Sequence, residues 1–353
     1  MGGRRRARVV GEAERHVTAG GARIVGIHYA LPERVVTNDE IARAHPDWRL
    51  QILEKRTGVR ERHLAAPGET ALDLAERAAD GLLTRTGVDR SAIDVLLFCT
   101  QTPDHPMPPN ACLLQDRLGL PTTVAALDFT LACSGFVYGL YLAKSLVTSG
   151  AARTVLLVTA DTYSSLISPD DRGAFTLFGD GAAATLVSEG TPGLEEFLLG
   201  TDGSGAACFV VPAGGAREPR TAVAAAPGGD GAGSVRSREQ IHMDGPAVLA
   251  FVQREVPRNV RALLTAAGHG IADVDLVIFH QASQLALDHL TRELGVPAEK
   301  HFANLERVGN TVSASLPIAL RDAELAGRLR SGDRVLLVSF GVGLSWGSCL
   351  LRW

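Results

Sequence analysis

The sequence predicts an α/β protein built from two similar halves, and three observations support this prediction. Short, uninterrupted apolar runs such as DVLLFC and DLVIFH are typical of strands that are buried on both faces of a sheet. Longer segments of helical character separate these runs. The order of the runs occurs twice, once in residues 92–161 and again in residues 273–341. These observations favour one compact, duplicated α/β unit.

Each repeat is expected to contain a strand, a helix, a short strand, a loop, a long helix and a final strand. The first repeat opens with AIDVLLFCTQ at Ala92 and closes with RTVLLVTAD at Arg153. The second opens with DVDLVIFHQ at Asp273 and closes with DRVLLVSFG at Asp333. The corners LGLP and LGVP fall at matching places, so the two repeats can be aligned on them.

Four segments are expected along the chain. Residues 1–23 form an N-terminal extension that we expect to be mobile, since its basic start is not followed by the apolar stretch of a secretory signal. Residues 24–200 form the first half and residues 241–353 the second, which includes a helix near 245–268. Between the halves, residues 201–240 are rich in Gly, Ala and Pro, which predicts an irregular connection.

The composition excludes several classes of protein. A net charge of −4 provides no basic field to attract nucleic acid or an anionic membrane, and no apolar run has the length of a membrane span. The cysteines are odd in number and include no CxxC pair, which argues against a disulfide framework and a zinc site. We therefore expect a cytoplasmic protein without a metal, in which most thiols are buried: Cys99, Cys112, Cys133, Cys208 and Cys349.

Three polar residues occupy related places in the two repeats. When the LGLP and LGVP corners are aligned, Cys133 in ACSGF falls beside Asn310 in VGNTVSAS, and each precedes a long helix. When the first strands are aligned, His280 falls on Cys99, and each ends a strand. Because ligands of open α/β sheets bind at the carboxyl ends of strands, we expect Cys133, His280 and Asn310 to converge on one site.

Each of these residues also has an ordinary structural role. A cysteine is most often a small buried hydrophobe, a histidine can end a strand, and an asparagine commonly caps a helix. A thiol at a helix N-terminus, however, faces the positive end of the helix dipole, which predicts a lowered pKa for Cys133 and a reactive thiolate. With a histidine and an asparagine at related positions, covalent catalysis is the favoured interpretation.

Two glycine-rich turns complete the set of motifs. FGVGLSWGS, which starts at Phe340, leads into a final strand, and the lack of a following helix disfavours a phosphate-binding role. We expect this turn to expose a backbone N–H that forms an oxyanion hole together with the N–H of Cys133. FGDGAAATLV, which starts at Phe178, is expected to be a structural turn before a buried strand.

Together the motifs resemble one family. ACSGF at Cys133, HQAS at His280 and GNTVSAS at Asn310 are similar to the Cys-His-Asn set of the β-ketoacyl-ACP synthase III family, in the thiolase superfamily. RTGVRERH, DDRGAF, VPAGGAREP and GVGLSWGS match as well. The resemblance runs from Ile24 to Trp353 and implies the thiolase fold, a duplicated five-layered αβαβα sandwich, and a homodimer.

The resemblance also implies the reaction of a ketosynthase III-like acyltransferase. Cys133 would take an acyl group from a thioester, usually acyl-CoA, and the acyl-enzyme would then meet a malonyl thioester on a carrier protein. His280 and Asn310 would stabilise the enolate that forms as carbon dioxide leaves, and the carbanion would attack acyl-Cys133. The backbone N–H groups of Cys133 and Val342 would hold the oxyanion. No cofactor is implied beyond the CoA thioester substrate.

Further substrate-binding residues follow from the same resemblance. Arg56, Arg172 and Trp48 match residues that flank the adenine and phosphates of CoA, although Trp48 lies further from RTG than is usual. Met107 in DHPMPPN matches a position that reaches into the acyl pocket of the partner subunit. Ser283 stands where the family pattern HQAN has asparagine.

The surface expected to contact the carrier protein departs from the family pattern. Leu285 stands in place of an arginine, and Ala250 and Glu293 stand where lysine is frequent, whereas Arg292 keeps a charge. Losing such charges weakens the attraction of an acidic carrier protein. We therefore hypothesise that the enzyme does not serve the housekeeping fatty-acid carrier and acts in secondary metabolite biosynthesis, with a dedicated carrier protein, CoA or a free small molecule.

Three alternative functions are considered. Acyl transfer from a thioester to a hydroxyl or an amine, without decarboxylation, would use the same Cys-His-Asn site and stays open. A non-catalytic partner subunit is disfavoured by the intact Cys-His-Asn set. A papain-like hydrolase also uses Cys, His and Asn, but the internal repeat and the missing CGSCW-type signature argue against it.

Overall fold

The structure is a computed structural model that describes residues 21–229 and 234–353. Most of the expected mobile extension, residues 1–23, lies outside the described residues. Its last two residues do not belong to an extension, because the first strand, β1, already spans Ala22–Ala30 and pairs along its length with β7. The first half of the fold therefore begins two residues earlier than the sequence suggested.

The first half contains a five-stranded mixed sheet in the order β1-β7-β6-β4-β5. β4 (Val95–Cys99) runs parallel to β5 (Ala125–Phe129) and to β6 (Thr154–Asp161), whereas β7 (Gly181–Glu189) is antiparallel to both β6 and β1. β4 is buried at every position and β6 at all but the first, as expected for apolar strands covered on both faces.

The second half contains a four-stranded sheet in the order β13-β14-β15-β8. β13 (Leu276–Phe279) is parallel to β14 (Arg334–Gly341), and β15 (Ser345–Arg352) is antiparallel to β14 and to β8 (Leu194–Thr201). β8 corrects the expected boundary at residue 200. Because its hydrogen bonds run to β15, it belongs to the second half, and the strands of the first half end with β7.

The two sheets repeat one strand order. β1, β7, β6 and β4 correspond to β8, β15, β14 and β13, and β5 corresponds to a single parallel bridge between Val277 and His301. The predicted repeat is therefore confirmed, with one difference. The short strand expected in the second repeat is reduced to this bridge, because only His301 of that segment pairs with β13.

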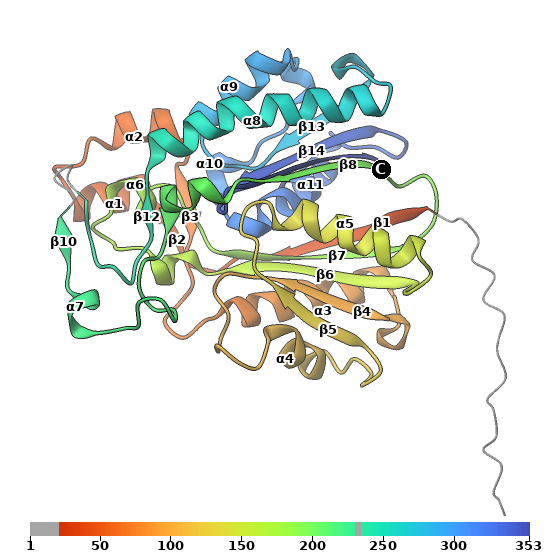
Figure 1. Ribbon diagram of the computed structural model, residues 1–353, viewed down its shortest axis with the longest axis horizontal. Helices are drawn as coiled ribbons and strands as arrows, with labels where there is room; N and C mark the ends of the chain where they lie inside the picture. The colour runs from red at the N-terminus through yellow and green to blue at the C-terminus, as the bar shows by residue number, and fades with distance from the viewer. Residues whose placement is uncertain (1–20, 230–233) are drawn as a thin grey trace, which may run out of the picture.

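Helices form three layers around the two sheets, as Figure 1 shows. The layers are an outer pair on the first sheet, a central pair between the sheets and an outer pair on the second sheet: α3 (Ala71–Thr86) and α4 (Asn110–Arg117), α5 (Gly135–Thr148) and α11 (Ser315–Leu325), and α8 (Gly245–Ala266) and α9 (Gln284–Leu294). The expected five-layered αβαβα sandwich is confirmed, as is the helix expected near 245–268.

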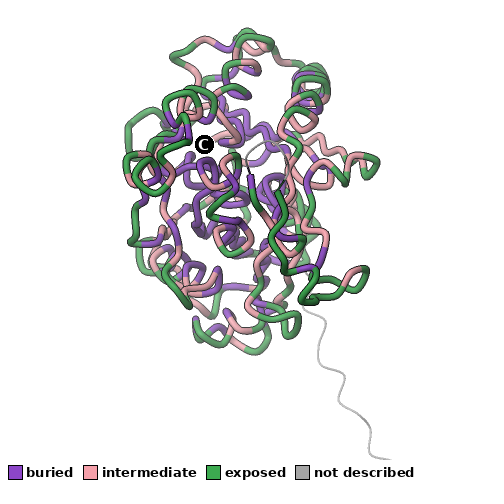
Figure 2. Tube along the Cα trace, turned by 90° about the vertical axis from the view of Figure 1, so that its left-hand side faces the viewer, coloured by how far each residue is buried: buried purple, intermediate pink, exposed green. Residues whose placement is uncertain are grey.

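The central layer is packed from both sides and forms one of the large hydrophobic clusters of the core. Phe136, Leu140 and Ala143 of α5 are fully buried, in one cluster with apolar residues of both sheets and of α11. Gly139 lets α5 approach β6 closely, since a Cβ at this position would lie 2.6 Å from a methyl of Leu157. Figure 2 shows the buried segments concentrated in the middle of the molecule. The central helices are therefore fixed, and so are the loops at their N-termini.

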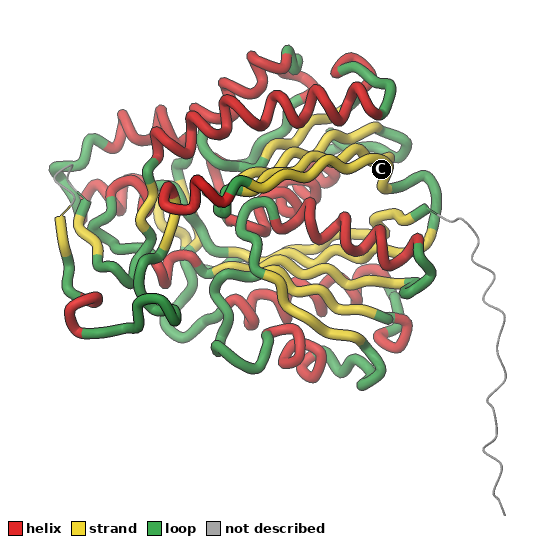
Figure 3. The backbone as a smooth tube through the Cα atoms, in the orientation of Figure 1, coloured by secondary structure: helices red, strands yellow, loops and turns green. Residues whose placement is uncertain are grey.

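Shorter elements gather at one end of the sandwich, as Figure 3 shows. Outside the connection between the halves they are β2 (Val35–Thr37), α1 (Asn38–Ala44), α2 (Leu50–Thr57), β3 (Glu61–His63), α6 (Arg172–Phe175) and α10 (Leu305–Val308). Short 3₁₀ helices link several elements: η1 (Arg90–Ala92), η2 (Tyr163–Leu166), η3 (Gly203–Cys208), η4 (Ile271–Asp273), η5 (Ala298–Lys300) and η6 (Val312–Ala314).

The Gly- and Ala-rich connection, residues 201–240, contains more local structure than an irregular loop. Besides η3, it and the residues just after it form β9 (Phe209–Val210), α7 (Ala222–Ala225), β10 (Gly228–Gly229), β11 (Val235–Arg236) and β12 (His242–Met243). A salt bridge of 2.9 Å from Arg236 to the buried Asp171 attaches the connection to α6. None of the described helices is long and apolar enough to cross a bilayer.

Candidate active site

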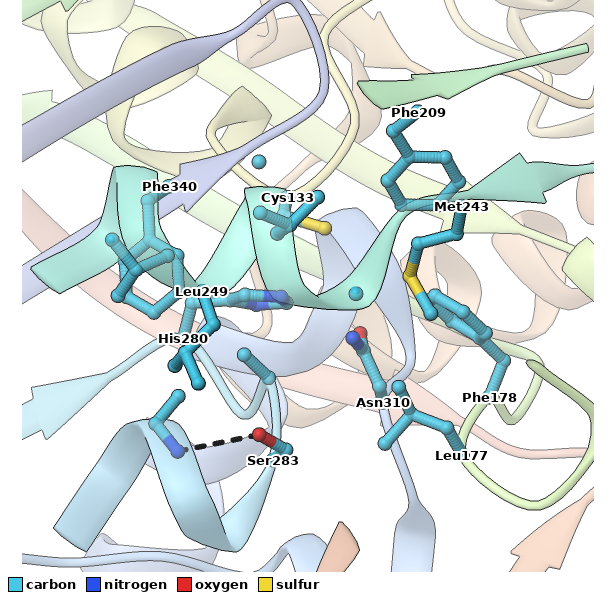
Figure 4. A pocket seen from close by; sticks show the side chains of 16 residues that line it. Cys133, Leu177, Phe178, Phe209, Met243, Leu249, His280, Ser283, Asn310 and Phe340 are labelled. Atoms are coloured by element: carbon cyan, nitrogen blue, oxygen red, sulfur yellow. Dashed lines mark hydrogen bonds between the residues drawn. The ribbon is translucent and has the colours of Figure 1, made fainter. Parts of the chain in front are cut away.

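The structure brings Cys133, His280 and Asn310 together, as the repeat predicted. All three line one cavity of about 120 Å³, into which their side chains converge in Figure 4. Cys133 lies in the loop between β5 and α5, His280 follows β13, and Asn310 lies in the loop before α11. The two halves therefore meet at this cavity, at the carboxyl ends of their strands.

Cys133 is almost fully buried, two residues before the start of α5. The end of β14 lies directly against it, because a Cβ on Gly341 would be 2.7 Å from the Cβ of Cys133 and 3.1 Å from its Sγ. Any side chain at Gly341 would displace the thiol. The glycine therefore allows the following turn, with Val342, to approach the sulfur.

The pKa of the Cys133 thiol differs from the sequence-based expectation. Burial raises this pKa, the negative charge of Asp161 raises it further, and a hydrogen bond with the backbone of Cys133 itself acts in the opposite direction. The predicted lowering of this pKa is wrong, because the thiol is buried and lies near the carboxylate of Asp161. The thiol is neutral at rest, so a neighbouring base must accept its proton when it attacks.

His280 can act as that base. Burial lowers its pKa to about 3, so the imidazole is neutral near pH 7. Nδ1 is hydrogen bonded to the hydroxyl of Ser315, the first residue of α11, at 2.6 Å, and the ring packs edge-on against Phe340. In Figure 4 the ring of His280 points into the cavity. Because Nδ1 is engaged by Ser315, Nε2 is the ring nitrogen that remains for a substrate.

Asn310 is held by its backbone and by one side-chain oxygen. Its N–H donates to Leu177 and its carbonyl accepts from Gly179, so the FGDG turn forms the support of this residue. Oδ1 accepts from the backbone N–H of Val312 at 2.9 Å. Because that oxygen is occupied, the Nδ2 amide group is the part of Asn310 that faces the cavity as a hydrogen-bond donor.

The turn at Val342 is fixed next to Cys133 by two serines. Ser345 donates a hydrogen bond of 2.7 Å to the carbonyl of Val342, and its oxygen lies 2.7 Å from the hydroxyl of Ser134. Within the described part of the chain, the backbone N–H groups of Cys133 and Val342 donate to no other residue. They are therefore available to an oxygen bound beside the sulfur, and their role as an oxyanion hole stays a prediction.

Asp161 is a buried carboxylate that holds two segments next to the site, and it was not predicted from the sequence. One carboxylate oxygen accepts the N–H of Gln101 at 2.8 Å, and the other accepts both the N–H and the hydroxyl of Ser313. Burial raises the pKa of Asp161 to about 7. Its position at the end of the apolar run RTVLLVTAD was the available signal, since a carboxylate ending a buried strand needs partners.

The remaining predicted residues lie at different distances from the cavity. Ser283 lines it and caps α9 by accepting the N–H of Ala286, the dashed contact in Figure 4. Arg56, exposed in the last turn of α2, and Arg172, at the start of α6, are not part of its lining. Met107 is 81% exposed in the loop after β4 and also lies outside the lining.

The expected role of Trp48 is not supported. Its ring is buried in a small apolar cluster with Val36, Ile41 and Leu64, and it stacks on His45 with ring centroids 4.0 Å apart. A tryptophan that flanks an adenine needs an open face. The shift of Trp48 relative to RTG places it in this core instead.

Among the described residues there is no group of three or more His, Cys, Asp or Glu side chains that could hold a metal ion.

Comparison with known proteins gives a consistent result. A model described as 3-oxoacyl-(acyl-carrier-protein) synthase III matches residues 127–203, and the model of its C-terminal part matches residues 264–353. A β-ketoacyl-(acyl-carrier-protein) synthase III of Roseiflexus castenholzii is 41% identical, with alignment over 94% of this chain and 98% of the relative.

Two solved structures extend the comparison. A 3-oxoacyl-(acyl-carrier-protein) synthase III is 46% identical, with a TM-score of 0.92 over 94% of this chain and 100% of that one. The priming β-ketosynthase of the R1128 polyketide pathway is 29% identical, with a TM-score of 0.83 over 96% of this chain and 98% of that one. Fold, site and relatives agree, and this chain belongs to the β-ketoacyl-(acyl-carrier-protein) synthase III family of acyltransferases.

Proposed function

We propose that the protein acylates Cys133 from an acyl thioester and then joins this acyl group to a malonyl thioester in a decarboxylative Claisen condensation. The observation that carries the proposal is the convergence of Cys133, His280 and Asn310 on one buried cavity. Each comes from a different loop, and the two halves contribute different chemistry. The first half supplies the nucleophile, and the second supplies the hydrogen-bonding groups for a developing enolate.

The first half-reaction forms the acyl-enzyme. The neutral thiol of Cys133 transfers its proton to Nε2 of His280 as the sulfur attacks the thioester carbonyl. The resulting oxyanion accepts hydrogen bonds from the N–H groups of Cys133 and Val342, which the Ser134–Ser345 contact holds in place. The C–S bond to the leaving thiol then breaks, and that thiol departs with the proton.

The second half-reaction forms the carbon–carbon bond. A malonyl thioester occupies the emptied cavity, and its carboxylate leaves as carbon dioxide. Between the two half-reactions the imidazole of His280 exchanges its proton with solvent, so that Nε2 carries the proton and Ser315 donates to Nδ1. The enolate oxygen then accepts hydrogen bonds from Nδ2 of Asn310 and from Nε2–H of His280. The nucleophilic carbon attacks the acyl group on Cys133, and the C–S bond breaks with the Cys133 sulfur leaving as a thiolate. The thiolate takes up a proton from solvent, and a β-ketoacyl thioester is released. The sequence of steps uses no cofactor besides the thioesters.

One wall of the catalytic cavity is apolar. Val248, Leu249 and Val252 of α8 and Ala286 of α9 line one side. This wall suits the pantetheine arm shared by CoA and carrier proteins. Arg56 and Arg172 lie outside the lining of the catalytic cavity. Their positive charges would contact a phosphate of CoA and not the reacting carbon. We propose both arginines as CoA contacts and do not propose Trp48.

We further infer a homodimer through the edge of the first sheet. β5 ends that sheet with β4 as its one neighbour, and Leu127 is 44% exposed on it. An open edge strand with an exposed apolar residue is normally paired or covered. The nearby loop with Met107, 81% exposed, would then reach the second copy.

The outer surface of α8 and α9 supports the hypothesis of a changed carrier partner. Leu285 is 49% exposed where an arginine was expected. Glu293 forms a salt bridge of 2.7 Å with Arg261, so an arginine of α8 is neutralised by the acid that stands in place of a lysine. This weakens the positive field that steers an acidic carrier protein. The hypothesis of a dedicated carrier or of CoA as acceptor rests on this surface and on the sequence pattern.

The test combines two measurements on the wild-type protein. Intact-protein mass spectrometry with a panel of acyl-CoAs should show one added acyl group. Malonyl-CoA or malonyl carrier protein should then remove that group with release of carbon dioxide. Acylation followed by transfer to an alcohol or amine without carbon dioxide would favour the alternative acyltransferase reaction. No acylation with any donor would contradict both.

A further inference from the structure

A second cavity adjoins the catalytic one. It measures about 450 Å³, and its lining includes Gln101, Thr130, Tyr163, Phe209, Ile241 and Val342. Phe209 lines both cavities, and Thr130 and Val342 come from the two segments that flank Cys133. In Figure 4 the sulfur of Cys133 points toward the side on which Phe209 lies.

We infer that the acyl chain extends into the second cavity, an assignment that rests on the proposed function. A thioester that reacts at Cys133 has two arms, and two cavities meet beside the sulfur. The catalytic cavity, walled by α8 and α9, takes the pantetheine arm. The chain left on Cys133 is then free to extend past Phe209 into the second cavity, so the lining of that cavity determines which acyl chains are accepted.

The lining carries a hydrogen-bonded polar pair, Gln101 and Tyr163. The hydroxyl of Tyr163 donates to Oε1 of Gln101. Tyr163 is 2% exposed, whereas Gln101 is only half-buried. Within the described part of the chain, Nε2 of Gln101 donates to no other residue. The pair therefore leaves two amide N–H donors for whatever fills the cavity.

Both members of the pair are fixed by the ends of neighbouring parallel strands. The register of β4 and β6 pairs Cys99 with Thr159, so Gln101 and Tyr163 follow these strands side by side. Asp161 accepts the backbone N–H of Gln101 at 2.8 Å, and the ring of Tyr163 lies 5.4 Å from that of Phe178. A donor held in this way is prepared for a partner of defined position.

The polar pair is an exception in a largely apolar lining, which also includes Leu166, Val210, Val211 and Ile241. Covering the amide of Gln101 with methylene groups removes it from water and returns no hydrogen bond, so an unbranched alkyl chain leaves this donor unsatisfied. An acyl chain with a hydroxyl or keto oxygen would replace the lost water. We propose that Gln101, oriented by Tyr163, selects acyl donors whose chain carries an oxygen that accepts a hydrogen bond from Nε2.

Paired donors of equal length test this proposal. Rates of Cys133 acylation are measured by intact mass for butyryl-CoA, β-hydroxybutyryl-CoA and γ-hydroxybutyryl-CoA. The wild-type protein should prefer at least one hydroxylated donor. Gln101→Met, which keeps the length of the side chain and removes the donor, should lower the rate for that donor by about ten- to a hundredfold and leave butyryl-CoA unchanged or faster.

The positioning role of Tyr163 has its own signature. Tyr163→Phe keeps the ring and removes the hydroxyl, so Gln101 loses its orientation but not its donors. It should reduce the preference for the hydroxylated donor by a smaller factor than Gln101→Met, without changing the rate for butyryl-CoA. A merely structural role would slow both donors equally.

Two results would overturn the proposal. One is a wild-type preference for butyryl-CoA over both hydroxylated donors, and the other is an equal effect of Gln101→Met on all three. Should no donor acylate the wild-type protein, the proposed function itself fails. The subsite is then tested by the Kd values of the same thioesters for Cys133→Ala, where tighter binding of a hydroxylated thioester supports it and equal Kd values refute it.

Discussion

The ends of β4 and β13 are equivalent positions in the two halves, yet they carry opposite roles. Cys99 ends β4 and is fully buried. Its Sγ donates to the carbonyl of Leu131 at 2.9 Å, and Gly135 covers it so closely that a Cβ there would lie 2.3 Å from the sulfur. His280 follows β13 and lines the catalytic cavity. The position at the end of β4 therefore lies in the hydrophobic core, and the position after β13 is part of the candidate active site.

The second pair of equivalent positions remains open in both halves. Cys133 precedes α5 and Asn310 precedes α11, and both line the cavity. The duplicated fold thus provides four related positions near its centre, of which three line the cavity: Cys133, His280 and Asn310. The comparison shows that the halves are alike in backbone and different in chemistry. The first contributes the sulfur, and the second contributes groups that donate hydrogen bonds to oxygen.

The largest expected effect is that of Asn310→Ala, which tests whether the two halves of the fold serve different half-reactions. Asn310→Ala should slow decarboxylation of the malonyl thioester by about a hundred- to a thousandfold, because the enolate loses a fixed donor. Acylation of Cys133 should stay within about threefold of the wild-type rate, because Asn310 does not contact the first oxyanion. Carbon dioxide release and intact mass measure the two steps. Equal losses in both would show that the halves do not divide the work.

Gly341→Ala should nearly abolish the first step. The new methyl would lie 2.7 Å from the Cβ of Cys133, so the thiol or the Val342 turn must move. A misplacement of this size is expected to reduce acylation about a hundredfold. Gly203→Ala is the matched control, since nothing lies within 4 Å of a Cβ at that position. Unchanged acylation in Gly341→Ala would show that the close approach of β14 is not needed.

The two buried titrating groups should respond to acid in opposite directions. His280, with its pKa lowered to about 3, stays neutral while the unfolded chain takes up a proton below about pH 6.5, so it destabilises the fold on acidification. Asp161, with its pKa raised to about 7, binds a proton in the folded state before the unfolded chain does, so its contribution to stability rises as the pH falls.

Urea unfolding at neutral pH and near pH 5 measures these contributions. His280→Asn should lose less stability on acidification than the wild type, and Asp161→Asn should lose more. Each difference should be on the order of 1–2 kcal/mol, since one pKa unit corresponds to about 1.4 kcal/mol. If the wild type, His280→Asn and Asp161→Asn all changed in stability by the same amount, neither group would titrate in this range.

The smallest expected effect is at Cys99, the buried position at the end of β4. Cys99→Ala should leave acylation within about twofold of the wild-type rate, because the Cys99 sulfur is bonded to Leu131 and is sealed from the cavity. The variant should lose about 1 kcal/mol of stability through the small void it creates. Acylation that falls as much as in a Cys133 variant would mean that the two thiols act together.

Much of the fold was predictable from its repetition. The apolar runs around VLLFC and LVIF, their spacing and the LGLP and LGVP corners indicated the duplicated α/β unit and the meeting of Cys133, His280 and Asn310. The assignment of β8 was not predictable in this way. LEEFLLGT is amphipathic and follows β7 directly, and only its pairing with β15 places it in the second sheet.

The supporting contacts of the site were beyond the sequence for a different reason. Asp161 and Ser313 are 152 residues apart, and Ser134 and Ser345 are 211 apart, so no local pattern relates them. The pKa of Cys133 failed as a prediction because the helix dipole can be read from neighbouring residues, whereas burial depends on the whole fold. Trp48 failed because the residues around it form a small core of their own.

The central claim is that Cys133, alone among the five cysteines, carries the acyl group. Intact-protein mass spectrometry after incubation with acyl-CoA tests this most directly, on the wild type, on Cys133→Ala and on Cys99→Ala. The account predicts one acyl adduct on the wild type and on Cys99→Ala, and none on Cys133→Ala. A full adduct on Cys133→Ala would contradict it.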